Sequence, residues 1–265
     1  MATLNATVRE DKRNFAQLRP IHITQDLLQR VDGSAEFSFG SSSVICSIYG
    51  PAEVKIRDEK LDKATIEVFV RPVIGTPGTK DKTDEFNLRT TFESVIMTGL
   101  HPRTLIQIVA QVKHDDGSIL ATAINATCLA LIDAGVPMKA IITAVTCIVT
   151  QQGDVLVDPT SKEAEEAVST HTFAFDSLFF NAVLCESNGI FTEKQFLESY
   201  VLCKSGANQI YEKIRESLGH KFQIQYISKT LHFDPSTMTG TATTTDIEPR
   251  QIVDDGDQEE DMELE

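Results

Sequence analysis

A glycine-containing turn ahead of an apolar helix is the first place where this chain could do chemistry. The turn, Asp115-Asp116-Gly117-Ser118, separates a strand-like run from a helix-like run. Backbone N–H groups at such a helix N-terminus can hold an anion, and an arginine or lysine normally reinforces phosphate capture. Here two aspartates precede Gly117, and Ile119 and Leu120 follow Ser118. An ordinary strand-to-helix turn is the simpler interpretation, and an anion site is the alternative.

Acidic residues near position 160 form a second candidate site. Asp158 is followed by Glu163, Glu165 and Glu166, and grouped carboxylates can bind a metal ion or act as acid and base. The pattern is also typical of a helix start. Asp158-Pro159 fits an N-cap followed by proline at the first helical position, and the glutamates would stabilise the positive end of the helix dipole. We expect the helix start and keep the carboxylate site as the alternative.

Basic side chains offer a third possibility, a local surface for RNA. Contacts from such a surface to phosphates would give salt-dependent binding without sequence preference. Ordinary solvated side chains are the alternative. The candidates for RNA binding are Lys55, Arg57, Arg71, Lys80, Lys82 and Arg89.

The net charge argues against a generally basic, nucleic-acid-binding chain. There are 39 acidic and 24 basic residues, a net charge of −15. Residues 246–265 hold ten acids and one base, a charge of −9 that leaves −6 for the preceding part. Any RNA contact must therefore be local. We predict a disordered acidic tail over residues 235–265. Residues 1–13 are expected to be a mobile leader without the apolar core of a signal peptide.

The spacing of cysteines and histidines argues against a disulfide framework or a zinc site. The five cysteines include no CxxC pair, and the six histidines show no HxxxH or HExxH spacing. Buried free thiols in a reducing compartment are therefore expected, and no metal or other cofactor. The apolar segment from Ser118 to Gly135 carries Asn125 and Asp133 and falls short of the ~20 apolar residues that a membrane span needs. We interpret it as the central buried helix of a soluble domain.

Hydrophobic periodicity predicts a single α+β domain over residues 14–234. Besides the central helix, helices are expected from Asp84 to near Gly99, after Asp158, and from a capping box at Thr192–Gln195 to about Leu218. Residues 74–83 are expected to be an exposed loop and residues 222–233 to have some strand character. The expected strands cover residues 35–39, 44–48, 64–72, 105–113, 141–149, 154–157, 171–176 and 182–185.

Several short motifs, taken in order and spacing, resemble the RNase PH family over about residues 14–218. The most specific stretches are YGPAEVK, LHPRT, DAGVPMKA and DPTSK. The matching positions are Asp32–Ala35, Val44–Tyr49 with Gly50-Pro51, Arg71-Pro72, His101–Thr104, Asp116–Ser118, Leu129–Val136 and Asp158–Thr160.

The resemblance implies an RNase PH-like fold, that of ribosomal protein S5 domain 2. Members of the family form six-membered rings around a channel for RNA, and the ring subunits of the eukaryotic RNA exosome are the members that this chain resembles most. The implied partners are other RNase PH-like ring subunits, S1/KH cap subunits, a hydrolytic nuclease subunit and single-stranded RNA in the channel. The implied locations are nucleus, nucleolus and cytoplasm, and no membrane is implied.

The resemblance also identifies the positions where chemistry would occur. Active members are phosphate-dependent 3′→5′ exoribonucleases whose phosphate loop reads Gly-Thr-Arg, and the aligned positions here are Ser118, Ile119 and Leu120. Of two catalytic aspartates six residues apart, Asp158 matches the first and Ala164 stands at the second. An alignment shift of one residue would bring a glutamate to the second position, but no shift brings an arginine beside the glycine turn.

These departures predict a non-catalytic ring subunit that serves as scaffold and lines part of the RNA channel. The alternative is an active phosphate-dependent 3′→5′ exoribonuclease, alone or in a site shared with a paired subunit. A free-standing RNA-binding module is a third possibility. It would be a stable monomer, whereas a ring subunit would purify within a complex.

Overall fold

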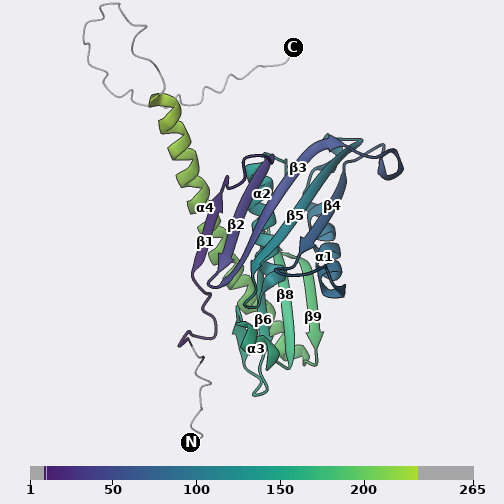
Figure 1. Cartoon of the computed structure of the whole chain (residues 1–265). Coiled ribbons are helices and arrows are strands. Elements are labelled where there is room, and N and C mark those ends of the chain that lie inside the picture. The colour runs from purple at the N-terminus through teal and green to yellow at the C-terminus, as the bar shows by residue number, and fades with distance from the viewer. Residues whose placement is uncertain (1–8, 10, 232–265) are drawn as a thin grey trace, which may run out of the picture. The chain divides into compact units, whose positions relative to one another are not determined.

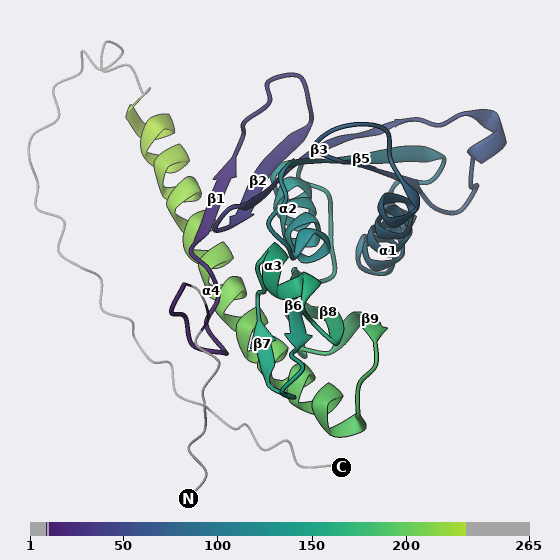
Figure 2. The same cartoon turned by 60° about the horizontal axis from the view of Figure 1, so that its bottom comes forward.

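Helix α2 (Ile119–Asp133) lies between two β-sheets (Figures 1 and 2). Every residue from 120 to 131 is buried, as a helix that is apolar on most sides requires. The central buried helix expected from the sequence is thus confirmed. The computed structural model describes Arg9 and residues 11–231, with side chains up to residue 223. Residues 1–222 form one compact unit and residues 223–265 a second, and the packing described here is that of the first.

The first sheet has the strand order β1-β2-β3-β5-β4 and is antiparallel except for the parallel pair β4–β5. Its hairpin β2–β3 is the one that alternating apolar residues predicted. The edge strand β1 was not predicted, because it contains only two apolar residues, Ile21 and Ile23, and both are half-buried. Helix α1 (Thr79–Val95) connects β4 to β5. The strands are β1 (Ile21–Gln25), β2 (Gly33–Phe39), β3 (Ser42–Glu53), β4 (Thr65–Arg71) and β5 (Thr104–His114).

The second sheet is antiparallel with the order β7-β6-β8-β9. Helix α2 covers one face, and helix α4 (Glu193–Leu231) packs on the other, where Phe173 contacts Phe196 and Tyr200. All of β6 is buried, which explains its continuous run of apolar and β-branched residues. Helix α3 (Ser161–Glu165) connects strand β7 to strand β8. The strands are β6 (Ile142–Val149), β7 (Val155–Val157), β8 (Ser169–Asp176) and β9 (Ala182–Gly189), and short 3-10 turns occupy Ile56–Asp58 and Thr98–Leu100.

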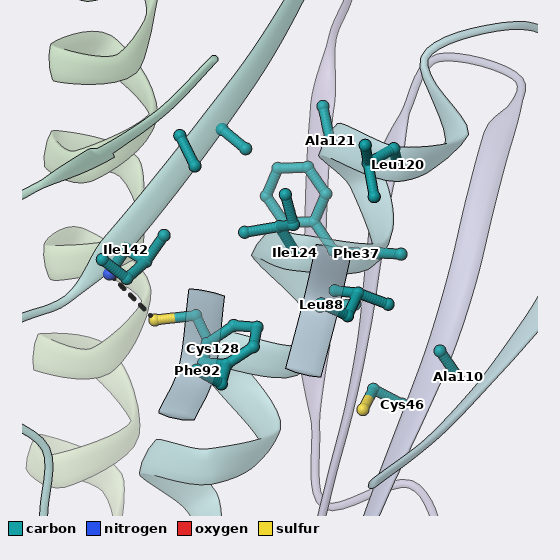
Figure 3. Close-up of a cluster of buried hydrophobic side chains, with 14 of the residues drawn as sticks. Phe37, Cys46, Leu88, Phe92, Ala110, Leu120, Ala121, Ile124, Cys128 and Ile142 are labelled. Atoms are coloured by element: carbon teal, nitrogen blue, oxygen red, sulfur yellow. Dashed lines mark hydrogen bonds between the residues drawn. The ribbon is translucent and has the colours of Figure 1, made fainter. Parts of the chain in front are cut away.

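One hydrophobic core joins the two sheets through α2 (Figure 3). Phe37 of β2, Leu88 and Phe92 of α1, and Cys128 of α2 are all fully buried in it. The Ile142 backbone N–H donates to Cys128 Sγ at 3.4 Å. Burial raises the pKa of Cys128 to about 12, so its thiol stays protonated and unreactive. Cys46, Cys147 and Cys203 are also buried free thiols, as expected, whereas Cys185 is exposed.

Two helix boundaries differ from the prediction. Helix α1 begins at Thr79 rather than Asp84, because the Asp81 carboxylate accepts from the Gly78 N–H at 2.7 Å and caps the helix. The end of the expected loop at residues 74–83 is therefore helical. Helix α4 begins at the predicted capping box but continues to Leu231. The strand character expected for residues 222–233 is wrong up to residue 231, and the last two lie outside the described residues.

The chain ends fall partly outside the described residues. The predicted acidic tail over 235–265 lies there, as do residues 1–8 and 10 of the predicted leader. Arg9 is described and buried, so at this position the leader is anchored rather than mobile. No helix among the described residues is long and apolar enough to cross a membrane.

Candidate functional site

The glycine turn, the start of α2, helix α3 and strand β9 surround a cleft of about 590 Å³, called the α2 cleft below. It brings together four of the positions singled out in the sequence, Ser118, Ile119, Leu120 and Ala164. Helix α1 adds Lys80, a residue that the sequence analysis assigned to a local basic surface for RNA. Positions far apart in the chain therefore share one cavity. Its other lining residues are Thr83, Asp84, Asp115, Gly117, Thr146, Pro159, Ser161, Glu165, Thr170, Thr172, Glu186 and Asn188.

The glycine turn is held tightly against the loop between β7 and α3. Gly117 has φ +81°, and a Cβ there would lie 2.7 Å from the Pro159 carbonyl oxygen, so a larger residue would strain the backbone and collide. The Ser42 hydroxyl donates to the Gly117 carbonyl at 2.7 Å, and the Ser118 hydroxyl donates to the Pro159 carbonyl at 3.4 Å. Within the turn the Asp116 N–H donates to the Ser42 hydroxyl and the Gly117 N–H to the Asp115 carboxylate, both at 3.1 Å, and the next side chain, Ile119, cannot donate a hydrogen bond.

The charge of the α2 cleft is unfavourable for phosphate. Four carboxylates line it against one lysine, Lys80. Asp84 is only 6% exposed. Its burial, followed by repulsion from Glu186 and Asp81, raises its pKa to about 7 in spite of the nearby Lys80. A phosphate dianion here would meet like charge without an arginine to bind it bidentately.

Asp158 does not face this cleft and does not cap a helix. It is 2% exposed and has φ +52°. Its carboxylate accepts from Arg19 Nε at 2.9 Å, Arg19 Nη2 at 2.6 Å and the Arg19 backbone N–H at 2.9 Å. The predicted N-cap at Asp158 is therefore wrong. Helix α3 is capped by Thr160, whose hydroxyl accepts from the Glu163 N–H while the Glu163 carboxylate accepts from the Thr160 N–H.

A second arginine, Arg9, extends this buried network, to which Arg13 also belongs through a hydrogen bond of 3.2 Å from its Nη1 to the Asp158 carbonyl oxygen. Arg9 donates to the Glu163 carboxylate at 2.9 and 2.8 Å and to the carbonyl oxygens of Val157 and Asp158 at 3.0 Å each. Burial alone would raise the pKa of Glu163, but hydrogen bonds from Arg9 and the Thr160 N–H lower it overall. Both carboxylates thus hold the N-terminal segment to the domain. The sequence analysis missed both arginines, since nothing in their local pattern indicates a partner more than 130 residues away.

The carboxylates predicted as a group are divided by the structure. Glu165 lines the α2 cleft, whereas Asp158 and Glu163 belong to the arginine network. Glu166 is exposed. Within the described part of the chain, no group of three or more His, Cys, Asp or Glu side chains is arranged to hold a metal ion.

The six basic candidates do not gather on one surface. Lys55 and Arg57 follow Glu53, the last residue of β3, which pairs with the first residue of β5. Arg71 pairs with Gln111, near the other end of β5. About 20 Å of strand separates these ends. On α1, Lys82 bonds Glu85 at 2.6 Å and Arg89 stacks over Phe86. The strand register thus separates Lys55 and Arg57 from Arg71, so the six do not form one continuous surface, and their role in RNA binding stays a prediction.

Comparison with known proteins finds similarity over most of the described chain. Residues 17–137 match the "3′ exoribonuclease family, domain 1" of RNase PH, and residues 140–199 match its domain 2. The exosome complex component rrp46 of Schizosaccharomyces pombe is 36% identical over 72% of this chain and 86% of its own length. The exosome complex exonuclease RRP46 homolog of Arabidopsis thaliana is 39% identical over 60% of this chain and 66% of its own.

A solved structure shares the same architecture. The crystal structure of rice Rrp46 superposes with a TM-score of 0.76 at 32% sequence identity, over 80% of this chain and 100% of that chain. The two sheets and the helices between and beside them are thus an RNase PH-like α+β fold, as the sequence motifs predicted.

Proposed function

Because the chain belongs to the 3′ exoribonuclease family of RNase PH, we propose that it is a non-catalytic ring subunit of an RNA exosome core. In this role it completes the ring, lines part of the channel for single-stranded RNA and supports 3′→5′ RNA processing and degradation. Degradation itself is carried out by a hydrolytic nuclease subunit bound to the ring. The names of its relatives as exosome components support this assignment.

The chemistry of the α2 cleft is the observation that carries the non-catalytic part of the proposal. The family's phosphate arginine is replaced by Leu120, which offers no donor, and Ala164 stands at the second carboxylate position. Asp158, at the first, is occupied by Arg19. A phosphorolytic reaction needs phosphate bound close to the RNA 3′ end. The surplus of carboxylates in the cleft repels both the phosphate ion and the phosphates of the RNA.

Exposed apolar side chains support assembly with other subunits. Ile56, Ile74 and Ile190 are each more than four-fifths exposed, and Phe179 is 74% exposed. They lie in connections at the margins of the sheets. Exposed apolar side chains that join into a contiguous patch are typical of surfaces that bind other proteins. We propose that they contact neighbouring RNase PH-like ring subunits and S1/KH cap subunits, and that the chain acts in the nucleus, nucleolus and cytoplasm.

An active exoribonuclease is the second candidate, and Glu165 is the observation in its favour. It lines the α2 cleft one position after Ala164 and leaves a carboxylate there. The decisive assay gives the purified chain inorganic phosphate and a 3′-single-stranded RNA and measures nucleoside diphosphates. We expect none. Nucleoside diphosphate release that is lost in Glu165→Gln but kept in the matched surface variant Glu166→Gln would refute the non-catalytic assignment.

Assembly is tested separately from catalysis. Co-expression with other ring and cap subunits should give a stoichiometric complex that co-elutes in size-exclusion chromatography. A chain that stays monomeric in the presence of those subunits would contradict the ring-subunit role. Imaging of a tagged chain in cells tests the proposed locations.

A further inference from the structure

The α2 cleft carries acidic groups that the non-catalytic role leaves unused. We propose that it binds a cationic side chain, an arginine or lysine on a basic segment of a partner protein. The inference rests on the proposed function in one respect, that phosphate and an RNA 3′ end do not occupy the cleft for catalysis.

The acidic groups converge from four different elements. Asp84 comes from α1, Asp115 from the turn before α2, Glu165 from α3 and Glu186 from β9. Lys80 is the single basic residue of the lining. With all groups ionised, the lining carries a net charge of −3, and clefts walled by protein concentrate such a field. The natural ligand of this lining is a cation.

Asp84 provides an independent sign of a missing partner. Its side chain lines the cleft and the residue is only 6% exposed, yet within the described residues its carboxylate accepts no hydrogen bond, and Lys80 acts on it only as a nearby charge. A buried carboxyl without a partner is costly. Its neighbour Glu186 accepts one hydrogen bond, from Asn87 Nδ2 at 3.0 Å, and retains free lone pairs. A guanidinium or ammonium group would satisfy both carboxylates together.

Four of the remaining lining residues are apolar, and they favour a side chain over a metal ion or RNA. Ile119, Leu120, Pro159 and Ala164 are apolar, and the methylene stems of lysine and arginine pack well on such walls while the charged end reaches polar groups. The volume of about 590 Å³ is within the range of sites for organic ligands. Among the described residues the acids are not arranged as metal ligands, and phosphates of RNA would be repelled.

The experiment measures binding of a fluorescent peptide, Gly-Arg-Arg-Arg-Gly amide, to the full chain by fluorescence anisotropy. A peptide with citrulline in place of each arginine is the neutral control. We expect the arginine peptide alone to bind. Its affinity should fall roughly tenfold or more in Asp84→Asn/Glu186→Gln, because the charge-assisted hydrogen bonds to both carboxylates are lost. The affinity for the arginine peptide should also rise from pH 6 to pH 8, because Asp84 loses its proton over this range. The titratable groups around Asp84 are Lys80, Asp81, Asp115, Glu165 and Glu186.

Two controls keep the result interpretable. Glu198→Gln/Glu212→Gln on α4 removes the same charge from the opposite face of the second sheet and should leave binding unchanged. Glu165→Gln, at an exposed position of the cleft, should weaken binding without disturbing the core.

Three outcomes would overturn the proposal. They are no peptide binding at millimolar concentration, equal losses in the cleft and α4 variants, and Mg²⁺ binding in place of the peptide with loss in the same cleft variants. Nucleoside diphosphate release from RNA and phosphate would instead overturn the proposed function, so the two failures are distinguishable.

Discussion

Replacing Asp158 with alanine would remove the carboxylate that accepts three hydrogen bonds from the buried Arg19 and would leave the half-exposed Asp116 as the remaining carboxylate bonded to its guanidinium. Arg19 is 6% and Asp158 2% exposed, and three hydrogen bonds of 2.6–2.9 Å join them. Burial opposes the charge of Arg19, but the bonds to Asp158 raise the pKa of Arg19 overall. An arginine side chain is not deprotonated in proteins, so the guanidinium stays charged when Asp158 is removed.

The expected cost follows from this burial. Removing one partner of a buried ion pair typically destabilises a protein by about 3–5 kcal/mol, a large part of the 5–15 kcal/mol that holds a typical domain folded. Arg19 also donates to Asp116 in the glycine turn, at 2.9 Å to its carbonyl and 3.2 Å to its carboxylate. We therefore expect the turn and the N-terminal segment to loosen together with α3.

The assay is urea unfolding followed by circular dichroism, with the exposed pair Arg57 and Asp58 as the matched control. Asp58→Ala should change the free energy of unfolding by less than about 1 kcal/mol. The double variant Arg19→Met/Asp158→Leu should recover much of the loss, because both members of the most buried ion pair among the described residues are removed together. A loss below about 1 kcal/mol in Asp158→Ala, or no recovery in the double variant, would refute the structural role assigned to this aspartate.

Three further substitutions test other parts of the structure. In Asp84→Asn, the free energy of unfolding should rise at pH 8 by at most about 4 kcal/mol and stay nearly unchanged at pH 4. The reason is that folding raises the pKa of Asp84 to about 7, so the native state loses stability as pH rises from about 4 to 7. The free energy of unfolding is measured by urea titration at both pH values. Equal gains at pH 4 and pH 8 would contradict this reasoning. Asn125→Leu should lower the free energy of unfolding by about 2–5 kcal/mol. The Asn125 side chain accepts from the Ala144 N–H at 2.8 Å and donates to the Ala144 carbonyl at 3.0 Å inside the core, and both backbone groups would lose their partner. An unchanged urea midpoint would argue against this pair of hydrogen bonds. Gly117→Ala should lower the free energy of unfolding by about 1–3 kcal/mol, because φ at Gly117 is +81° and a Cβ there would collide with the Pro159 carbonyl oxygen. Thermal unfolding measures the loss. An unshifted melting temperature would show that the turn can relax.

Local patterns were sufficient to predict most of the fold. The apolar period of α2, the alternation in β2 and β3, and the capping box at Thr192 each depend on residues close in the chain. Short motifs added the positions of the family's phosphate loop and carboxylates, and the structure places Ser118, Leu120 and Ala164 around one cleft. These features could be predicted because backbone geometry and side-chain periodicity act over a few residues.

The sequence by itself determined which residues alternate, which turns contain glycine and which family positions have lost their donors. Only the tertiary structure decided the partners of the charged side chains. It pairs Arg19 with Asp158 across 139 positions of the chain, brings Lys80 to the α2 cleft and separates Arg71 from Lys55. Charged side chains have long flexible stems and no required period, so the topology of the sheets, rather than local pattern, sets their neighbours. The acidic character of the cleft arises in the same way, from four elements that meet only in the folded chain.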